Sequence, residues 1–325
     1  GTSTNVAAGM LIGSANTALE LVGESAFVQV GAGTLYTLSG AKHATYTGTA
    51  TLTAGSKTVN VIDVALTAGQ QTDMLGSFLV STGDSATTLA VYQIAAVVSS
   101  TEVTLDRNFD GSNTGAAKPI RIRAIEPARS TAARFQTNSI PYGTPFSSWR
   151  RLCLFNTTEY SVVYPNRIRW SGIAGSTEGT TPFTGTQAFD ADGYLDLSSN
   201  MGPILRVTRH ANYTVAFGRE QMTILYGAPT LDSAGSLEVT TQYAIPVIYS
   251  QLVSVSTPFG LAFVSTSLNA GSSTVYLWDG SGPPQAISTT RLALAAIGGV
   301  TPIGYFNEHL FIHKNATKDI YVLHI

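Results

Sequence analysis

Three aspartates in the stretch FDADGYLDLSS, Asp190, Asp192 and Asp196, form the densest group of side chains able to do acid–base or metal chemistry. Paired carboxylates about 5–10 Å apart can cleave glycosidic bonds. Asp190 and Asp192 with Gly193 also match a fragment of a calcium loop, but the third oxygen donor and the distal Glu of an EF-hand are missing. A turn capped by Asx hydrogen bonds is therefore the simpler interpretation.

The other reactive residue types are scattered. The sequence contains no G-x-S-x-G nucleophile motif, and the single cysteine, Cys153, lies in the alternating stretch RLCLFN, which favours a core position. Asp106 and Asp110 in LDRNFDG suit a hairpin turn. A spacing of four along a strand separates His309 from His313 by about 13 Å, too far to share a metal ion. We therefore expect no catalytic residue, no cofactor and no metal. The remaining histidines are His43, His210 and His324.

Tryptophans and arginines gather between residues 149 and 170. Trp149, Trp170 and Trp278 could form a platform for sugars, but Trp170 and Trp278 hold equivalent places in two repeated segments, which favours packing. The arginines nearby could contact an acidic partner, or Arg167 and Arg169 could form salt bridges with a neighbouring sheet or subunit. The candidate interface residues are Arg150, Arg151, Arg167 and Arg169.

The composition favours a globular protein with a weakly charged surface. Of 325 residues, 44% are hydrophobic and only 12% are charged, and the net charge is -2. Soluble domains ordinarily carry about 25% charged residues. The near-neutral balance argues against nucleic-acid recognition, and the low charge suits a surface that faces partners. No apolar run approaches the roughly 20 residues of a membrane helix, and the beginning GTSTNVAAGMLIG lacks the pattern of a signal peptide.

Short apolar runs bounded by Gly, Pro, Asn or Asp, such as Tyr160–Tyr164, Arg167–Trp170 and Tyr213–Phe217, predict an all-β fold. A pair of such runs recurs five times, and the second runs end near residues 39, 171, 226, 279 and 325. Without residues 43–125 the spacings all lie near 50, which is typical of a propeller blade with four strands. The sequence predicts a β-propeller of five or six blades, in which the segment Val6–Ile12 supplies the closing strand. Thr290–Ala296 is a weak helix candidate.

Residues 43–125 differ from the repeats and predict a separate module. Alternating Thr51, Thr53, Val59 and Val61 indicate short strands, of which we expect five to seven. A small inserted β-sandwich or barrel that emerges from a blade loop fits this pattern. The predicted domains are residues 1–42, a first blade with the closing strand, residues 43–125, the inserted β domain, and residues 126–325, the other blades.

The stretch from Tyr164 to Pro229 resembles virion proteins of bacteriophage tails and necks. In those proteins a P-x-R-[IV]-x-W-S strand precedes a variable acidic loop, a GPI element and a Y-G-x-P element. The resemblance covers about Tyr142–Ile325, with Ala7–Gly40 as a first blade, and it implies a propeller-bearing structural protein such as the nozzle of short-tailed phages. The matching residues are Pro165, Arg167, Ile168, Trp170, Ser171, Gly202, Pro203, Ile204, Tyr226, Gly227 and Pro229.

Two main classes of function follow. The first, which the resemblance implies, is a non-enzymatic virion tail protein that is assembled in the host cytoplasm. It would form a homo-oligomeric ring with other tail or neck proteins around the DNA channel, with passive contact to genomic DNA. The second is a glycan-binding or glycan-cleaving propeller that uses Trp149 and acids such as Asp190. A receptor-binding protein at the tail tip is a further alternative.

Overall fold

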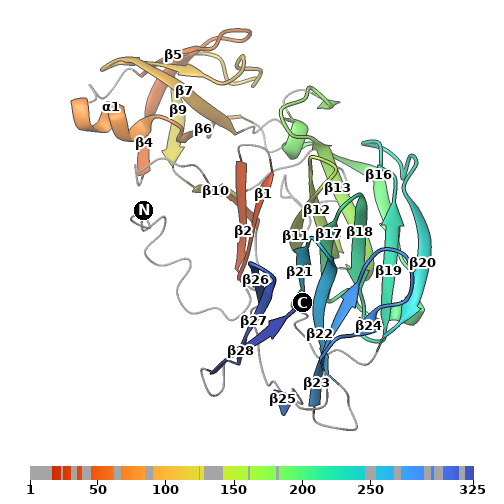
Figure 1. Ribbon diagram of the computed structural model, residues 1–325. Coiled ribbons are helices and arrows are strands. Elements are labelled where there is room, and N and C mark those ends of the chain that lie inside the picture. The colour runs from red at the N-terminus through yellow and green to blue at the C-terminus, as the bar shows by residue number, and fades with distance from the viewer. Residues whose placement is uncertain are drawn as a thin grey trace. The chain divides into compact units, whose positions relative to one another are not determined.

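The computed structural model shows an all-β fold built from antiparallel sheets, as the sequence predicts (Figure 1). The chain divides into two compact units. One contains Gly1–Val163, Arg169–Gly193 and Leu231–Ser233, and the other contains Tyr164–Ile168, Tyr194–Thr230 and Ala234–Ile325. The structure describes residues 17–22, 25–30, 35–38, 45–61, 67–84, 91–123, 125–127, 142–159, 162–180, 183–245, 254–266, 272–288, 294–295, 303–314 and 319–325.

Five antiparallel sheets follow one another along the chain, and in each the strands are paired in sequence order. Sheet 1 contains β1 (Thr17–Val22), β2 (Ser25–Val30), β3 (Leu35–Leu38) and β10 (Ile125–Pro127). Sheet 2 contains β11 (Tyr142–Ser148), β12 (Arg151–Glu159), β13 (Val162–Ile173) and β16 (Phe189–Asp196). Sheet 3 contains β17 (Arg206–His210), β18 (Tyr213–Phe217), β19 (Gln221–Tyr226) and β20 (Glu238–Ala244). Sheet 4 contains β21 (Ser254–Thr257), β22 (Gly260–Thr266), β23 (Ser272–Trp278) and β24 (Gln285–Ala286), with β25 (Leu294–Ala295) also paired to β23. Sheet 5 contains β26 (Ile303–Phe306), β27 (His309–Lys314) and β28 (Asp319–His324).

The first two strands of every sheet are joined by a link of two residues. The paired residues that flank the links are Val22 and Ser25, Ser148 and Arg151, His210 and Tyr213, Thr257 and Gly260, and Phe306 and His309. Links of two residues set the register of a hairpin, so the five sheets share the same length of first link.

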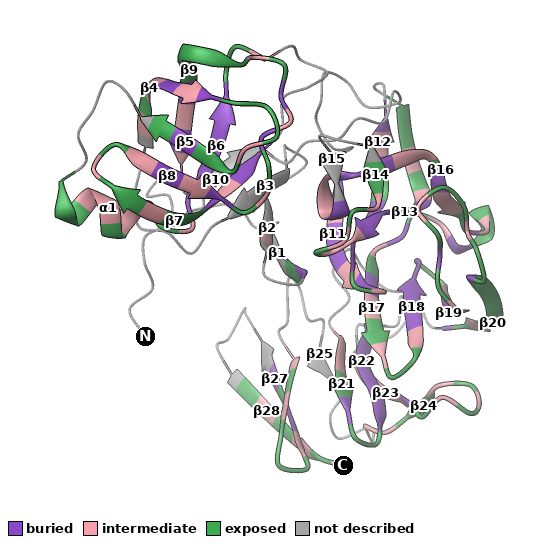
Figure 2. Ribbon diagram, turned by 90° about the horizontal axis from the view of Figure 1, so that it is seen from above, coloured by how far each residue is buried: buried purple, intermediate pink, exposed green. Residues whose placement is uncertain are grey.

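Within the second unit, consecutive sheets pack face to face (Figure 2). Because successive side chains of a strand point to opposite faces, Leu261 and Phe263 on β22 contact sheet 3 while Ala262 and Val264 contact sheet 5. The Phe263 ring lies 5.1 Å from that of Phe217 on β18. Sheet 4 is thus covered on both faces.

The first strands of neighbouring sheets also lie together within each unit: β1 contacts β11, β17 contacts β21, and β21 contacts β26. His210 near the end of β17 and Ser256 near the end of β21 are joined by a 2.8 Å hydrogen bond. The β17–β18 and β21–β22 links therefore lie at the same end of sheets 3 and 4.

The region between β3 and β10 forms a closed barrel with the strand order β4, β5, β8, β7, β6, β9. Its core includes Val59, Tyr92, Val103 and Ile120, all fully buried. The strand count agrees with the expected five to seven, whereas the domain boundaries themselves stay a prediction. The strands are β4 (Thr45–Leu52), β5 (Thr58–Val61), β6 (Phe78–Ser81), β7 (Tyr92–Ser99), β8 (Glu102–Leu105) and β9 (Gly115–Arg123).

The barrel also carries helix α1 (Ala68–Met74), which the sequence analysis missed. The Thr67 side chain accepts the Gln70 N–H, and the Gln70 side chain accepts the Thr67 N–H, which forms a capping box. Met74 anchors the helix in the barrel core. Among the described residues, no helix is long and apolar enough to cross a membrane.

The expected strand boundaries need one correction. The sequence predicts two separate strands at residues 160–164 and 167–170, whereas residues 162–164 and 167–170 lie on the single strand β13, which pairs with β12. Residues 160 and 161 lie outside the described residues. Pro165 is exposed within that strand, where a residue without an N–H group is tolerated. Of the helix candidate Thr290–Ala296, residues 294–295 form β25 instead. The closing strand expected at Val6–Ile12 lies outside the described residues.

Short elements complete the described fold. They are the β14 (Gly179–Thr180) and β15 (Phe183–Thr184) hairpin, and the 3-10 helices η2 (Gly185–Gln187) and η3 (Ser199–Met201).

Candidate functional site

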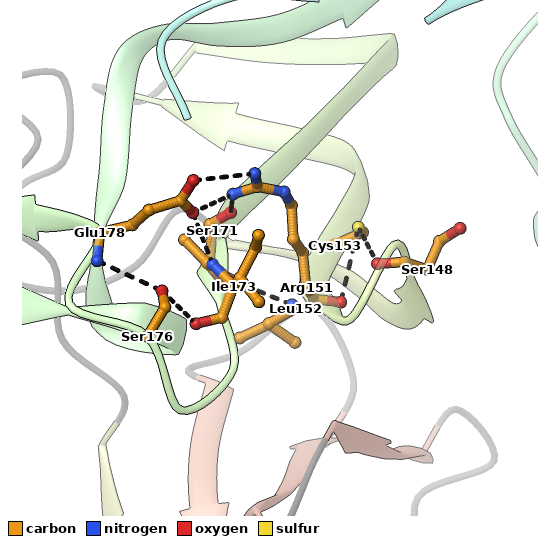
Figure 3. A network of polar contacts seen from close by, with 9 residues as sticks. Ser148, Arg151, Leu152, Cys153, Ser171, Ile173, Ser176 and Glu178 are labelled. Carbon is orange, nitrogen blue, oxygen red and sulfur yellow. Dashed lines mark hydrogen bonds and ion pairs between the residues drawn. The ribbon is translucent and has the colours of Figure 1, made fainter. Parts of the chain in front are cut away.

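Arg151, the first residue of β12, ties the end of sheet 2 to the loop that follows β13 (Figure 3). Its Nη1 donates to a Glu178 carboxylate oxygen at 2.6 Å and to the Ser171 carbonyl oxygen at 2.8 Å. The Ile173 N–H donates to the same carboxylate. Partial burial alone raises the pKa of Glu178, but the hydrogen bonds from Arg151 and Ile173 outweigh it and hold the pKa below its ordinary value.

Arg167 on β13 is held by one carboxylate and two aromatic rings. Its Nε and Nη2 donate to the two oxygens of Asp196 on β16, each at 2.7 Å. The guanidinium carbon lies 3.8 Å from the ring centroids of both Tyr164 and Tyr194. A planar cation next to two rings and a carboxylate is fixed in direction, so Arg167 acts as a clamp between β13 and β16.

Arg169, two residues further along β13, reaches both neighbouring strands. It donates to both oxygens of Glu159 on β12, at 2.6 and 2.9 Å, and to the carbonyl oxygen of Asp190 on β16 at 2.7 Å. Thr157 donates a further hydrogen bond to Glu159. The charges of this pair are therefore neutralised inside the sheet.

Arg150 differs from the other three candidate arginines. Its side chain is exposed, and it forms the two-residue link between β11 and β12 together with Trp149. Both residues have a left-handed backbone, with φ of 53° at Trp149 and 57° at Arg150. The structure thus pairs Arg151, Arg167 and Arg169 with carboxylates of this chain and presents Arg150 to solvent. The expected contact of the four arginines with a partner stays a prediction.

The aspartates singled out from the sequence have structural contacts. Asp190 accepts the Asp192 N–H at 2.9 Å, which is the expected Asx turn, and Asp196 binds Arg167. Asp106 accepts the Gln93 N–H, and Asp110 accepts the hydroxyl hydrogen of Tyr92, a residue whose pKa is raised by burial and by this hydrogen bond. Within the described ranges, no group of three or more His, Cys, Asp or Glu side chains is arranged to hold a metal ion.

The histidines meet partners that the sequence did not indicate. His309 on β27 is the cross-strand neighbour of His324 on β28, with ring centroids 4.9 Å apart, and His324 lies 3.6 Å from the Glu308 carboxylate. Burial lowers the pKa of His210, which contacts Ser256. The His309–His324 pair depends on the strand register, which the spacing of residues does not give. His43 lies outside the described residues, as does the His313 side chain.

The buried tryptophans confirm the packing interpretation. Trp170 and Trp278 lie on the third strands of sheets 2 and 4, and both are among the largest fully buried side chains. Trp149 is half-buried, and its ring meets Trp170 edge to face at 6.4 Å. Cys153 is also buried, as predicted.

Two of the three elements that carry the resemblance are joined in the fold. The carbonyl oxygen of Pro165 accepts the Ile204 N–H at 2.9 Å, which connects the first element to the GPI element. Gly227 of the Y-G-x-P element has φ of 91°, and a Cβ atom there would lie 2.0 Å from the Ser236 carbonyl oxygen. Only glycine fits this close approach.

Comparisons with known proteins leave the family open. No protein-family model matches the chain, and no curated protein matches it. Among solved structures, the endosialidase of phage phi92 is similar over 91% of this chain and 40% of that chain, with 14% identity and a TM-score of 0.28. This chain therefore corresponds to less than half of the endosialidase, and a likeness at that score carries no conclusion about fold or activity.

Proposed function

We propose that this chain is a non-enzymatic structural protein of a bacteriophage tail or neck, similar to the nozzle of short-tailed phages. In this proposal it is made in the host cytoplasm and assembles in the virion as a homo-oligomeric ring around the DNA channel. The other tail or neck proteins are its partners.

The proposal includes a propeller of five or six blades in which each of the five described sheets is one blade. Three features support it: the first link of every sheet has two residues, first strands lie together within each unit, and sheet 4 is covered on both faces. Blades pack in this manner because one sheet cannot bury both of its own faces. In the proposed propeller, Val6–Ile12 supplies the closing strand of the blade that contains β28.

The observation that carries the proposed function is the structural role of the residues on which the resemblance to tail proteins rests. Arg167 clamps β13 to β16, Trp170 is buried, and Pro165 receives the backbone hydrogen bond from Ile204. These residues hold strands and sheets together. Residues with such packing roles are expected in a structural protein of a phage tail or neck.

Two of the aspartates that the glycan-cleaving alternative would use, Asp190 and Asp196, form local contacts within the chain. Asp196 binds the Arg167 guanidinium with both oxygens, and Asp190 caps a turn. Both oxygens of Asp196 are thus already engaged by a guanidinium of the same sheet. This supports the structural role over glycan cleavage.

Cryo-electron microscopy of the virion that contains this chain tests the proposal. We expect symmetric density for copies of the chain at the tail or neck, and the density of the barrel should disappear in particles carrying a deletion of Thr45–Arg123. A tail that is fully accounted for by other proteins would contradict the proposal. Binding of the purified chain to a glycan array would then favour the glycan-binding alternative.

A further inference from the structure

The Trp149–Arg150 link is a strained turn occupied by two large side chains. Links with two consecutive left-handed residues are of the I′ type, in which Asn-Gly is the favoured pair. A Cβ atom makes this backbone unfavourable, so neither Trp nor Arg suits it. Strained backbone positions of this kind cluster at functional sites. The identity of these two side chains therefore points to a role beyond turning the chain.

The strained turn is also held rigidly. The Ala174 N–H donates to the Arg150 carbonyl oxygen at 2.8 Å, and Trp149 rests edge to face on the fully buried Trp170. Arg151, the next residue, is fixed by Glu178 and Ser171. Because the turn is ordered before any partner arrives, binding through it costs little conformational entropy.

Arg150 is the member of the arginine group whose charge no described carboxylate neutralises. Its side chain is exposed, while Arg151, Arg167 and Arg169 each bind an acid of sheet 2 or its loop. Trp and Arg are the residue types that most often dominate binding energy at protein interfaces. The turn thus offers a rigid aromatic and cationic contact.

An aromatic and acidic surface of matching character lies on sheet 3. Tyr226 on β19 and Glu238 on β20 are cross-strand neighbours, so their side chains point to the same face. Tyr226 is 49% exposed, its ring lies 5.7 Å from that of Tyr213 on β18, and the Glu238 side chain is exposed as well. We call Tyr226 and Glu238 the β19–β20 patch.

We propose that the Trp149–Arg150 turn of one copy of this chain docks on the β19–β20 patch of a second copy, with Arg150 paired to Glu238. The contact joins two different surfaces, and contacts of this head-to-tail type generate rings when the rotation closes. Charge complementarity sets the orientation, and the aromatic and apolar side chains supply buried area. The low charge of the chain, 12% of residues, favours such self-association. This inference rests on the proposed ring.

Sedimentation velocity of the full chain up to about 100 µM tests the contact. We expect the wild type to self-associate, and Arg150→Glu and Glu238→Arg each to weaken association by about tenfold or more. The double variant carrying both changes should associate again, as should an equimolar mixture of the two single variants, because each restores opposite charges at the contact. Arg219→Glu, a reversal of an exposed charge in the β18–β19 turn, is the matched control and should leave association unchanged.

A second variant separates the contact from folding. Arg150→Gly relieves one left-handed residue, so the melting temperature should rise while association is lost. Glu308→Gly makes the same relief in the β26–β27 link, where Asn307 and Glu308 are both left-handed, and should keep association intact. A monomeric wild type, or an Arg150→Glu variant that associates normally, would overturn the inference. Either result leaves the location of the chain in the virion to be decided by its density in the particle.

Discussion

Arg169 and Glu159 face each other across neighbouring strands of sheet 2 and form a two-pronged ion pair that solvent does not reach. The exposed fractions of their side chains are 0% and 2%. Burying two charges carries a large desolvation penalty, so the pair is tolerated only because each charge has its partner and further hydrogen bonds.

Removing one member of this pair should therefore be severe. Arg169→Met leaves the Glu159 carboxylate buried without its cation, and we expect a loss of about 3–5 kcal/mol in the free energy of unfolding. The double variant Arg169→Met with Glu159→Leu should recover much of this loss, since no buried charge is left unpaired. Urea denaturation of both variants measures the two values. Equal stability of the single variant and the wild type would show that the pair is open to water.

Substitution of two glycines that have nearly the same φ can distinguish the cost of a steric clash from the cost of backbone strain. Gly227 and Gly280 have φ of 91° and 92°, but a Cβ atom would meet the Ser236 carbonyl oxygen only at Gly227, and the space at Gly280 is open. Gly280→Ala should cost about 1–2 kcal/mol from left-handed strain alone. Gly227→Ala should cost clearly more, because backbone must shift as well. Thermal or urea unfolding of the pair decides this, and equal losses would contradict the close approach at Gly227.

The Arg151–Glu178 pair predicts a contribution to stability that depends on pH. The pKa of Glu178 lies below its ordinary value of 4.5 in the folded chain, so its contribution is present above that pH and is lost as the pH falls through the folded pKa. Glu178→Gln should remove this part of the acid dependence and flatten the stability curve below about pH 4.5.

Unfolding measured at several pH values checks the expectation. Glu220→Gln, which removes an exposed carboxylate outside the proposed contact, is the matched control. An unchanged acid limb in Glu178→Gln would mean that the pair contributes nothing to folding.

The barrel should fold without the sheets, and the sheets without the barrel. Thr45 at the start of β4 is the cross-strand partner of Arg123 at the end of β9, so the chain enters and leaves the barrel at adjacent positions. A deletion of Thr45–Arg123 with a short Gly/Ser link should leave a cooperatively melting β protein, as should residues 43–125 alone. Circular dichroism of both proteins measures this. Loss of cooperative melting in the deletion protein would make the barrel part of one common core.

The regular strands were predictable from the sequence, but their polar partners were not. Tyr213–Phe217 was expected and found with the same bounds, since alternating apolar residues between Asn and Gly leave little choice. Pro165 and Asn166 suggested a turn because proline is rare in strands, yet the exposed position in β13 tolerates it. The Thr67-x-x-Gln70 pattern at the beginning of α1 is a capping-box signature, and it would have identified that helix from the sequence.

The ion pairs depended on information that the sequence pattern does not contain. Arg167 meets Asp196, which lies 29 residues away, through the pairing of β13 with β16. Arg169 meets Glu159 through the pairing of β13 with β12. Both contacts follow from strand register, which local propensity does not specify.

The fixed two-residue link at the start of every sheet has an evolutionary consequence. The second connections of the same sheets differ in length, with two residues between β12 and β13 and five between β22 and β23. One extra residue in a first link would shift the register and exchange the two faces of a strand, whereas the second connections accept length changes. Insertions and deletions should therefore accumulate among descendants of this chain at the second connections, while first links diverge only by substitution.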